Sequence, residues 1–143
     1  MSVFAAAHGR GRTPQKRLWD ALALLWMGLI FYLSSQPQLP SAPGWWDVLL
    51  KKGAHLGAYA VLGALYAQGW GRSRPRWQPW LGAVFYAVSD EVHQAFVPGR
   101  HPWVVDVLID GMGAGLGVRY GQVWLGRVTH RIWKRSRPQG PVG

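Results

Sequence analysis

The chain has 143 residues, of which 15% are charged and 49% hydrophobic, and its formal net charge is +10. This length is typical of a single domain, but soluble domains usually contain about 25% charged residues. The lack of cysteine excludes disulfide frameworks, thiolate metal sites and a cysteine nucleophile. A chain that is both basic and apolar is either a nucleic-acid-binding domain or a small membrane protein whose charges lie in its loops.

Four apolar segments follow one another along the chain. Residues 18–35 carry one charge, and about 18 helical residues nearly span a hydrocarbon core that is about 30 Å thick. Residues 53–70 contain no Asp, Glu, Lys or Arg, residues 77–97 contain two acids near their end, and residues 102–126 contain three charges. We therefore predict an all-α protein, an integral membrane bundle of four transmembrane helices.

The basic residues are unevenly distributed around these segments. Four Lys or Arg precede the first segment, three lie between the second and third, and five follow the fourth, whereas the two other loops contain two and one. By the positive-inside rule, both termini and the middle loop are cytoplasmic. Nucleic-acid binding loses its support because the basic residues bracket apolar segments and form no single stripe. The predicted organisation is a basic cytoplasmic segment (1–17), a membrane domain (18–126) and a basic cytoplasmic tail (127–143).

Ionisable and polar residues gather toward the predicted outer ends of the helices. A charge at bilayer depth costs about 2.5–3.5 kcal/mol unless it is paired or hydrated, so such residues are informative. Helical spacing puts His55 and Tyr59 on one face, as it does Asp106 and Asp110. The residues that we expect at this depth are Lys51, Lys52, His55, Tyr59, Asp90, Glu91, Gln94, Arg100, Asp106 and Asp110.

Two interpretations of this polar cluster remain open. In one, the acids and cations pair and hold the helix ends together. In the other, they form a hydrated pocket for acid–base chemistry on a phosphate- or sugar-bearing lipid. No HExxH or GxSxG motif occurs, a divalent metal held by the acids stays open, and the cofactor is undetermined. The candidate catalytic residues are His55, Asp90, Glu91, Asp106 and Asp110, and the candidate binding residues are Lys52, Tyr59, Gln94 and Arg100.

A stripe of small residues continues below the acids of the fourth segment. Gly113, Gly117 and Gly121 form two overlapping GxxxG steps. Such steps let another helix approach closely. We prefer packing within the chain to dimerisation as the role of this stripe.

Two longer runs carry a family resemblance. The run YAVSDEVHQAFVPGRHPWVVDVLIDGMGAGLG (86–117) and the run KKGAHLGAYAVLG (51–63) closely resemble the motifs of the VanZ-like family of small bacterial membrane proteins. The ending of the first apolar segment, IFYLSSQP, is also similar to that family's opening. Ala58 stands where Glu is common in the family. The motif residues that the resemblance implies are Lys52, His55, Tyr59, Asp90, Glu91, Gln94, Pro98, Gly99, Arg100, Asp106 and Asp110.

The resemblance implies a place and a type of activity. It implies a multi-pass protein of the bacterial cytoplasmic (inner) membrane that acts on or handles a cell-envelope component and lowers sensitivity to the glycopeptide teicoplanin. The partners would be membrane lipids or a lipid-linked envelope precursor. Whether the protein is an enzyme is left open, and the alternative is a non-enzymatic membrane protein whose charged cluster is a structural lock or an anionic-lipid binding site.

Overall fold

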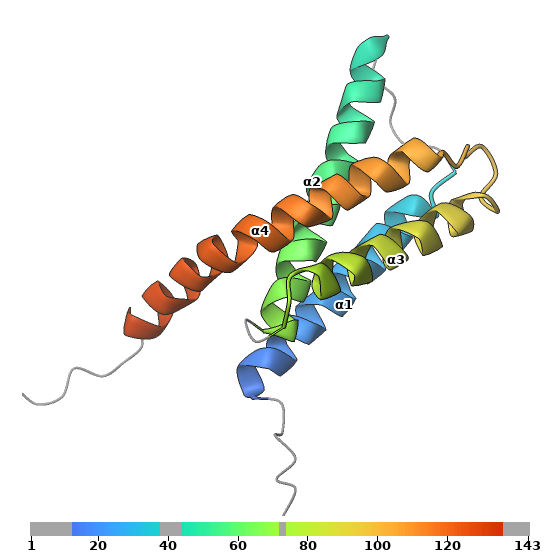
Figure 1. Cartoon of the computed structure of the whole chain (residues 1–143). Coiled ribbons are helices and arrows are strands. Elements are labelled where there is room, and N and C mark those ends of the chain that lie inside the picture. Colours follow the sequence, from blue (N-terminus) through green and yellow to red (C-terminus); the bar gives the residue numbers. More distant parts are fainter. Residues whose placement is uncertain (1–12, 38–43, 72–73, 136–143) are drawn as a thin grey trace, which may run out of the picture.

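Four helices make up the described part of the chain. The computed structural model describes residues 13–37, 44–71 and 74–135, and these residues contain α-helices and no strand. The predicted all-α class is therefore confirmed. The helices, shown in Figure 1, are α1 (Pro14–Ser34), α2 (Trp45–Trp70), α3 (Trp77–Gln94) and α4 (Val104–Arg135).

Three helices are longer than the apolar segments that predicted them, and α1 already begins at Pro14, inside the predicted N-terminal segment. α2 begins at Trp45, well before Gly53, because Lys51 and Lys52 end an apolar run but are good helix formers. Residues 127–135 of the predicted tail continue α4. The predicted terminal segments at 1–12 and 136–143 lie outside the described residues, as does 38–43 in the loop after the first helix.

Local signals mark the ends of these helices. α1 starts with Pro14, whose missing N–H is harmless in a first turn, and the Thr13 side chain accepts a hydrogen bond from the Lys16 backbone N–H. α2 ends at Trp70, and the glycine that follows, Gly71, has φ +80°, a conformation that glycine adopts without steric cost. Proline and glycine thus mark these two helix ends in the sequence.

The glycine stripe packs α4 against α2. A Cβ on Gly117 would lie 2.7 Å from the carbonyl carbon of Ala60. The neighbouring stripe glycines likewise approach α2, Gly113 at Leu56 and Gly121 at Ala64. Residue numbers rise together along both helices, so α2 and α4 run parallel. The glycine stripe thus packs against another helix of the same chain, which is the role that the sequence analysis favoured over dimerisation.

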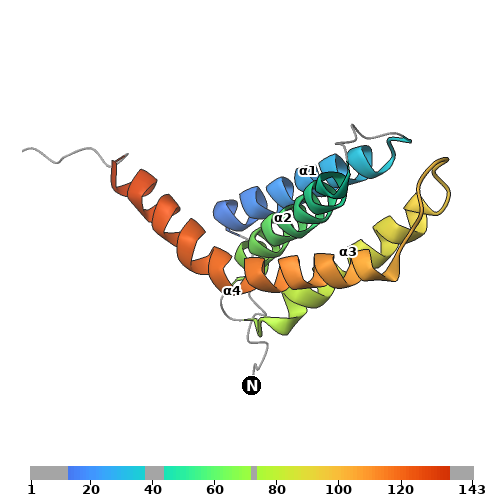
Figure 2. The same ribbon diagram turned by 90° about the horizontal axis from the view of Figure 1, so that it is seen from above.

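Aromatic side chains connect the helices by donating hydrogen bonds to backbone carbonyls of neighbouring helices. The Trp26 indole N–H donates to Ala58 O of α2 (2.9 Å), and the Tyr86 hydroxyl donates to Met27 O of α1 (2.6 Å). The Trp80 indole N–H donates to a carbonyl of α4 at 2.9 Å. These polar tips find partners while the rings fill apolar space. Figures 1 and 2 show the last turns of α4 extending away from the other three helices.

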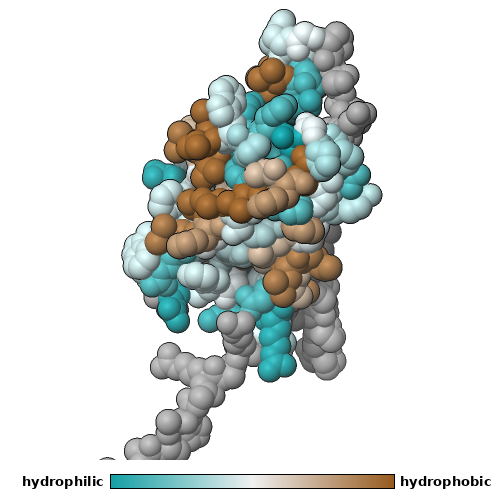
Figure 3. All heavy atoms as spheres, turned by 90° about the vertical axis from the view of Figure 1, so that its right-hand side faces the viewer, coloured by the Kyte–Doolittle hydropathy of each residue, from teal (hydrophilic) through white to brown (hydrophobic). Residues whose placement is uncertain are grey.

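The surface of the bundle is unusually apolar. Leu25, Phe85 and Phe96 are 71%, 72% and 81% exposed. Figure 3 shows hydrophobic patches exposed beside hydrophilic ones at the end where α2 and α4 begin. By length and composition, α1 is the one helix in the described part of the chain that is long and apolar enough to cross a membrane. α2 and α4 contain more glycine than α1, and α3 contains a larger share of polar residues.

Candidate functional site

The predicted polar residues gather at one end of the bundle. α1 and α3 end there, and the parallel helices α2 and α4 begin there (Figure 1). The contacts divide these residues into two groups. The α2–α4 cluster consists of Lys52, His55, Tyr59, Glu91, Asp106 and Asp110, and the α1 clasp consists of Ser34, Asp90, Gln94 and Arg100.

An imidazole and a buried carboxylate lie at the centre of the α2–α4 cluster. His55 Nδ1 lies 3.2 Å from Asp110 Oδ1. Asp110 is only 1% exposed, whereas the His55 side chain is 23% exposed. Asp106 and Glu91 also act on the imidazole through their charge. A carboxylate bound to Nδ1 orients the ring, which leaves Nε2 as the nitrogen available to a ligand or proton.

A second ion pair lies one helical turn closer to the start of both helices. The Lys52 ammonium donates to Asp106 Oδ1, and the same ammonium lies 5.0 Å from the centroid of the Trp103 ring. Both charged side chains are partly exposed. Lys52 and His55 lie three residues apart on α2, while their partners lie four apart on α4. The two pairs therefore stack along the α2–α4 contact, with Lys52 and Asp106 on the outside.

Glu91 brings α3 into the same cluster. Its Oε2 accepts a hydrogen bond of 2.9 Å from the backbone N–H of Trp103, just before α4 begins. Glu91 is buried, at 7% exposed. This bond fixes the approach of the chain to α4. One acid thus links the α3 end to the α4 start.

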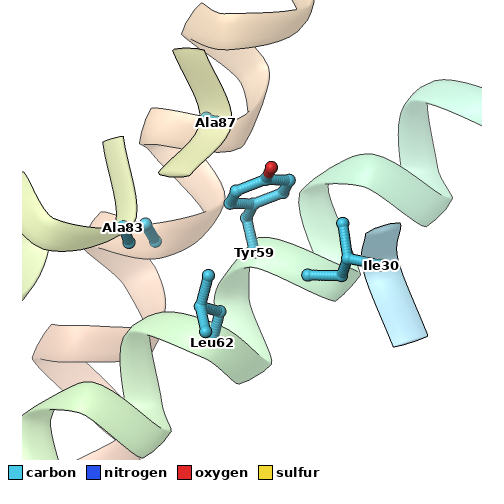
Figure 4. Close-up of a cluster of buried hydrophobic side chains, with 6 residues drawn as sticks. Ile30, Tyr59, Leu62, Ala83 and Ala87 are labelled. Atoms are coloured by element: carbon cyan, nitrogen blue, oxygen red, sulfur yellow. The ribbon is translucent and has the colours of Figure 1, made fainter. Parts of the chain in front are cut away.

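Tyr59 forms the floor of the cluster. The residue is 1% exposed, and its ring packs with Ile30, Leu62 and Ala87 in the apolar core. Figure 4 shows the hydroxyl directed away from Leu62. This hydroxyl is the one buried side-chain polar atom of the described residues that has no hydrogen-bond partner.

The α1 clasp holds the end of α1 against α3. Asp90 is buried and accepts two hydrogen bonds, one of 2.6 Å from the Ser34 hydroxyl and one of 3.0 Å from the Gln94 amide. Gln94 lies one turn beyond Asp90 on α3, at the i, i+4 spacing that brings two side chains of a helix together. A second link nearby joins Ser35 Oγ and His93 Nε2 at 2.9 Å. The carboxylate of Asp90 is thus satisfied by neutral donors.

A tight turn directs the Arg100 side chain to the end of α1. Pro98 and Gly99 precede Arg100, Gly99 has φ +80°, and the Arg100 N–H donates to Val97 O at 3.1 Å. These are the features of a type II turn, in which glycine takes the left-handed position. The Arg100 guanidinium then donates to two carbonyls at the end of α1, those of Gln36 (3.0 Å) and of Leu33 (2.9 Å).

We expect Arg100→Ala to loosen the end of α1. Hydrogen bonds to a charged group contribute about 1.5–3 kcal/mol, and partial exposure reduces this value. The free energy of unfolding should therefore fall by about 1–2 kcal/mol, measured by denaturant titration in detergent micelles. Arg74→Ala is the control, because exposed Arg74 bonds only to Gln78 one turn further on. Equal losses in the two variants would contradict the proposed clasp.

The cations are arranged differently from the paired network considered above. Of the three cations, Lys52 pairs with a cluster acid. Lys51 pairs with Asp47 on its own helix at 2.7 Å, and Arg100 binds backbone carbonyls. The sequence analysis also missed Ser34. Its signal was its position at the end of the first apolar segment, the same expected depth as Asp90.

The chemistry available to the α2–α4 cluster follows from its composition. Acids from two helices outnumber the one lysine and the histidine, and an oriented imidazole can accept or donate a proton near pH 7. Within the described residues, no group of three His, Cys, Asp or Glu side chains is arranged to hold a metal ion. The cluster is therefore suited to proton transfer and to the binding of hydrogen-bond donors.

Comparison with known proteins supplies the family. No curated protein and no solved structure matches the chain. The family profile described as VanZ/LLP1 matches residues 19–125, which run from the second turn of α1 through about two thirds of α4 and include every residue of both groups. The resemblance seen in the motifs is thereby confirmed, and the chain belongs to the VanZ/LLP1 family.

Proposed function

We propose that the chain is a multi-pass protein of the bacterial inner membrane, with four membrane-spanning helices and with both termini in the cytoplasm. The distribution of polarity supports this proposal. Large apolar side chains such as Phe85 face outward, while Asp90, Glu91 and Asp110 are buried between helices. Water would favour the opposite arrangement, whereas lipid favours this one. The parallel course of α2 and α4 also agrees with the predicted topology.

The α2–α4 cluster would then lie at the outward ends of the helices. We propose that it acts on or handles a cell-envelope component and thereby lowers sensitivity to teicoplanin. The observation that carries this proposal is the contact of 3.2 Å between the partly exposed His55 imidazole and the buried carboxylate of Asp110. A bundle held together by packing alone has no need of acids that burial makes costly, so their retention points to a function.

Teicoplanin susceptibility tests this proposal. A sensitive bacterium that expresses the parent chain should survive higher teicoplanin concentrations, and His55→Ala should lose that protection at a membrane level matched by immunoblot. Asp47→Asn is the control, because Asp47 bonds to Lys51 on the outer turn of α2, away from the cluster. If the parent chain gives no protection, the proposed resistance function is wrong. If His55→Ala protects as well as the parent, the α2–α4 cluster has no role in protection.

A structural lock is the second candidate, and the contacts favour it for the α1 clasp. The buried carboxylate of Asp90 accepts a hydrogen bond from Ser34 of α1, and Arg100 donates to two carbonyls at the end of α1, so both residues hold that end in place. Binding of anionic lipid at this end has less support. Lys51 and Lys52 are each paired with an acid, and Arg100 is bound to carbonyls.

A further inference from the structure

The unpartnered hydroxyl of Tyr59 points to a missing ligand. Buried polar atoms normally have a partner, and leaving one without costs stability. On α2 the Tyr59 side chain leans toward the start of the helix, the direction in which His55 lies. The hydroxyl is directed away from Leu62, which lies three residues further along α2 (Figure 4). It therefore faces the start of α2, where His55 contacts Asp110 in the α2–α4 cluster.

The groups around this hydroxyl decide the chemistry of the ligand. Ionised carboxylates only accept hydrogen bonds. The donors that reach Asp110 and Glu91 are His55 and the Trp103 N–H. Each carboxylate has lone pairs that can accept further hydrogen bonds, and a tyrosine oxygen can also accept one. The missing group is therefore a donor of several hydrogen bonds.

The net charge of the α2–α4 cluster indicates the charge of the ligand that it would bind. Three acids, Glu91, Asp106 and Asp110, face the single permanent cation Lys52, which is already bound to Asp106. An anion such as a phosphate would be repelled at the floor of the cluster, whereas a cation would be attracted. The described residues offer no three-ligand arrangement for a metal ion.

We infer that the floor of the α2–α4 cluster, at Tyr59, Glu91 and Asp110, binds a primary ammonium group of an envelope component. A primary ammonium presents three hydrogen-bond donors and no acceptor, which suits three acceptors from α2, α3 and α4. The inference rests on the proposed function, which places this end at the outer membrane surface. A lipid headgroup or a small soluble amine carries the same ammonium chemistry.

Lipid retention by the full chain tests this inference. The purified protein in detergent micelles is offered equal amounts of phosphatidylethanolamine, its trimethylated analogue phosphatidylcholine, and phosphatidylglycerol, and native mass spectrometry counts the retained lipids. We expect about tenfold more ethanolamine lipid than either of the others, since one hydrogen bond to a charged group is worth about tenfold in affinity. Equal retention of the three lipids would overturn the inference.

Tyr59→Phe examines the hydroxyl itself. It should lower retention of the ethanolamine lipid about tenfold and leave thermal stability unchanged or raised, because the removed hydroxyl has no partner within the chain. Tyr32→Phe is the matched control, because Tyr32 is 63% exposed on α1. If Tyr59→Phe retains the lipid like the parent, the ammonium site is wrong.

Two further comparisons distinguish a lipid ligand from a soluble amine, and the ammonium site from the proposed resistance function. Displacement of the lipid by free ethanolamine supports a site that the ammonium alone can fill, whereas retention against ethanolamine supports recognition of the whole lipid. If the protein retains the ethanolamine lipid selectively but gives no teicoplanin protection, the ammonium site is supported and the resistance function is wrong. Protection by the parent without selective retention would keep the proposed function and overturn this inference.

Discussion

Replacing Gly117 by alanine should destabilise the bundle more than any other single methyl group added to α4. The new Cβ would lie 2.7 Å from Ala60 C and 2.9 Å from Ala64 N, and both are backbone atoms that cannot move aside without shifting α2. Overpacking costs about 1–3 kcal/mol where side chains can adjust, so we expect a loss of about 3 kcal/mol or more in the free energy of unfolding. Denaturant titration in detergent micelles measures it.

Gly115→Ala is the matched control for this prediction. Gly115 lies two residues earlier on the same helix, and its added Cβ would meet the Trp80 ring at 3.6 Å, an ordinary van der Waals distance. Alanine is a better helix former than glycine by about 1 kcal/mol, so this variant should be unchanged or slightly more stable. Similar effects of the two substitutions would mean that the α2–α4 contact is not as close as described.

Much of this architecture follows from periodicity in the sequence. Glycines four residues apart at 113, 117 and 121 predict a face that another helix can approach, and the structure fills it with α2. The i, i+4 pair of Asp106 and Asp110 predicts that both acids share a face, and both do contact α2. Spacing along one helix fixes such faces because the helical period is regular.

Spacing along one helix does not fix how neighbouring helices are rotated. Arg100 and the acids are expected at one depth, but the Pro98–Gly99 turn directs its guanidinium to carbonyls of α1. Ser34 is a neutral residue at a helix end, and nothing in a single sequence shows that its hydroxyl meets Asp90 from another helix. Partner choice depends on tertiary packing, which the local pattern does not contain.

Asp90→Asn and Asp110→Asn should change stability in opposite directions. Both acids are buried, but Asp90 already accepts hydrogen bonds on both oxygens, from Ser34 and from Gln94. An amide there replaces one acceptor oxygen by an N–H₂ group and removes the charge that strengthens both hydrogen bonds, so the free energy of unfolding should fall by about 1–3 kcal/mol. This loss is what a structural lock requires.

Asp110→Asn should instead raise the free energy of unfolding by about 1–2 kcal/mol, because it removes a charge that burial makes costly and that the charges of Asp106 and Asp90 repel. The amide oxygen can still face His55, and the new N–H donors can meet the acceptors around Tyr59. The same variant should lose teicoplanin protection. A functional site often keeps residues that lower the stability of the protein, so replacing one of them raises stability and removes activity. Parallel denaturant titrations and susceptibility assays of both variants measure the two effects. A loss of stability in Asp110→Asn as large as in Asp90→Asn would make the α2–α4 cluster part of the lock.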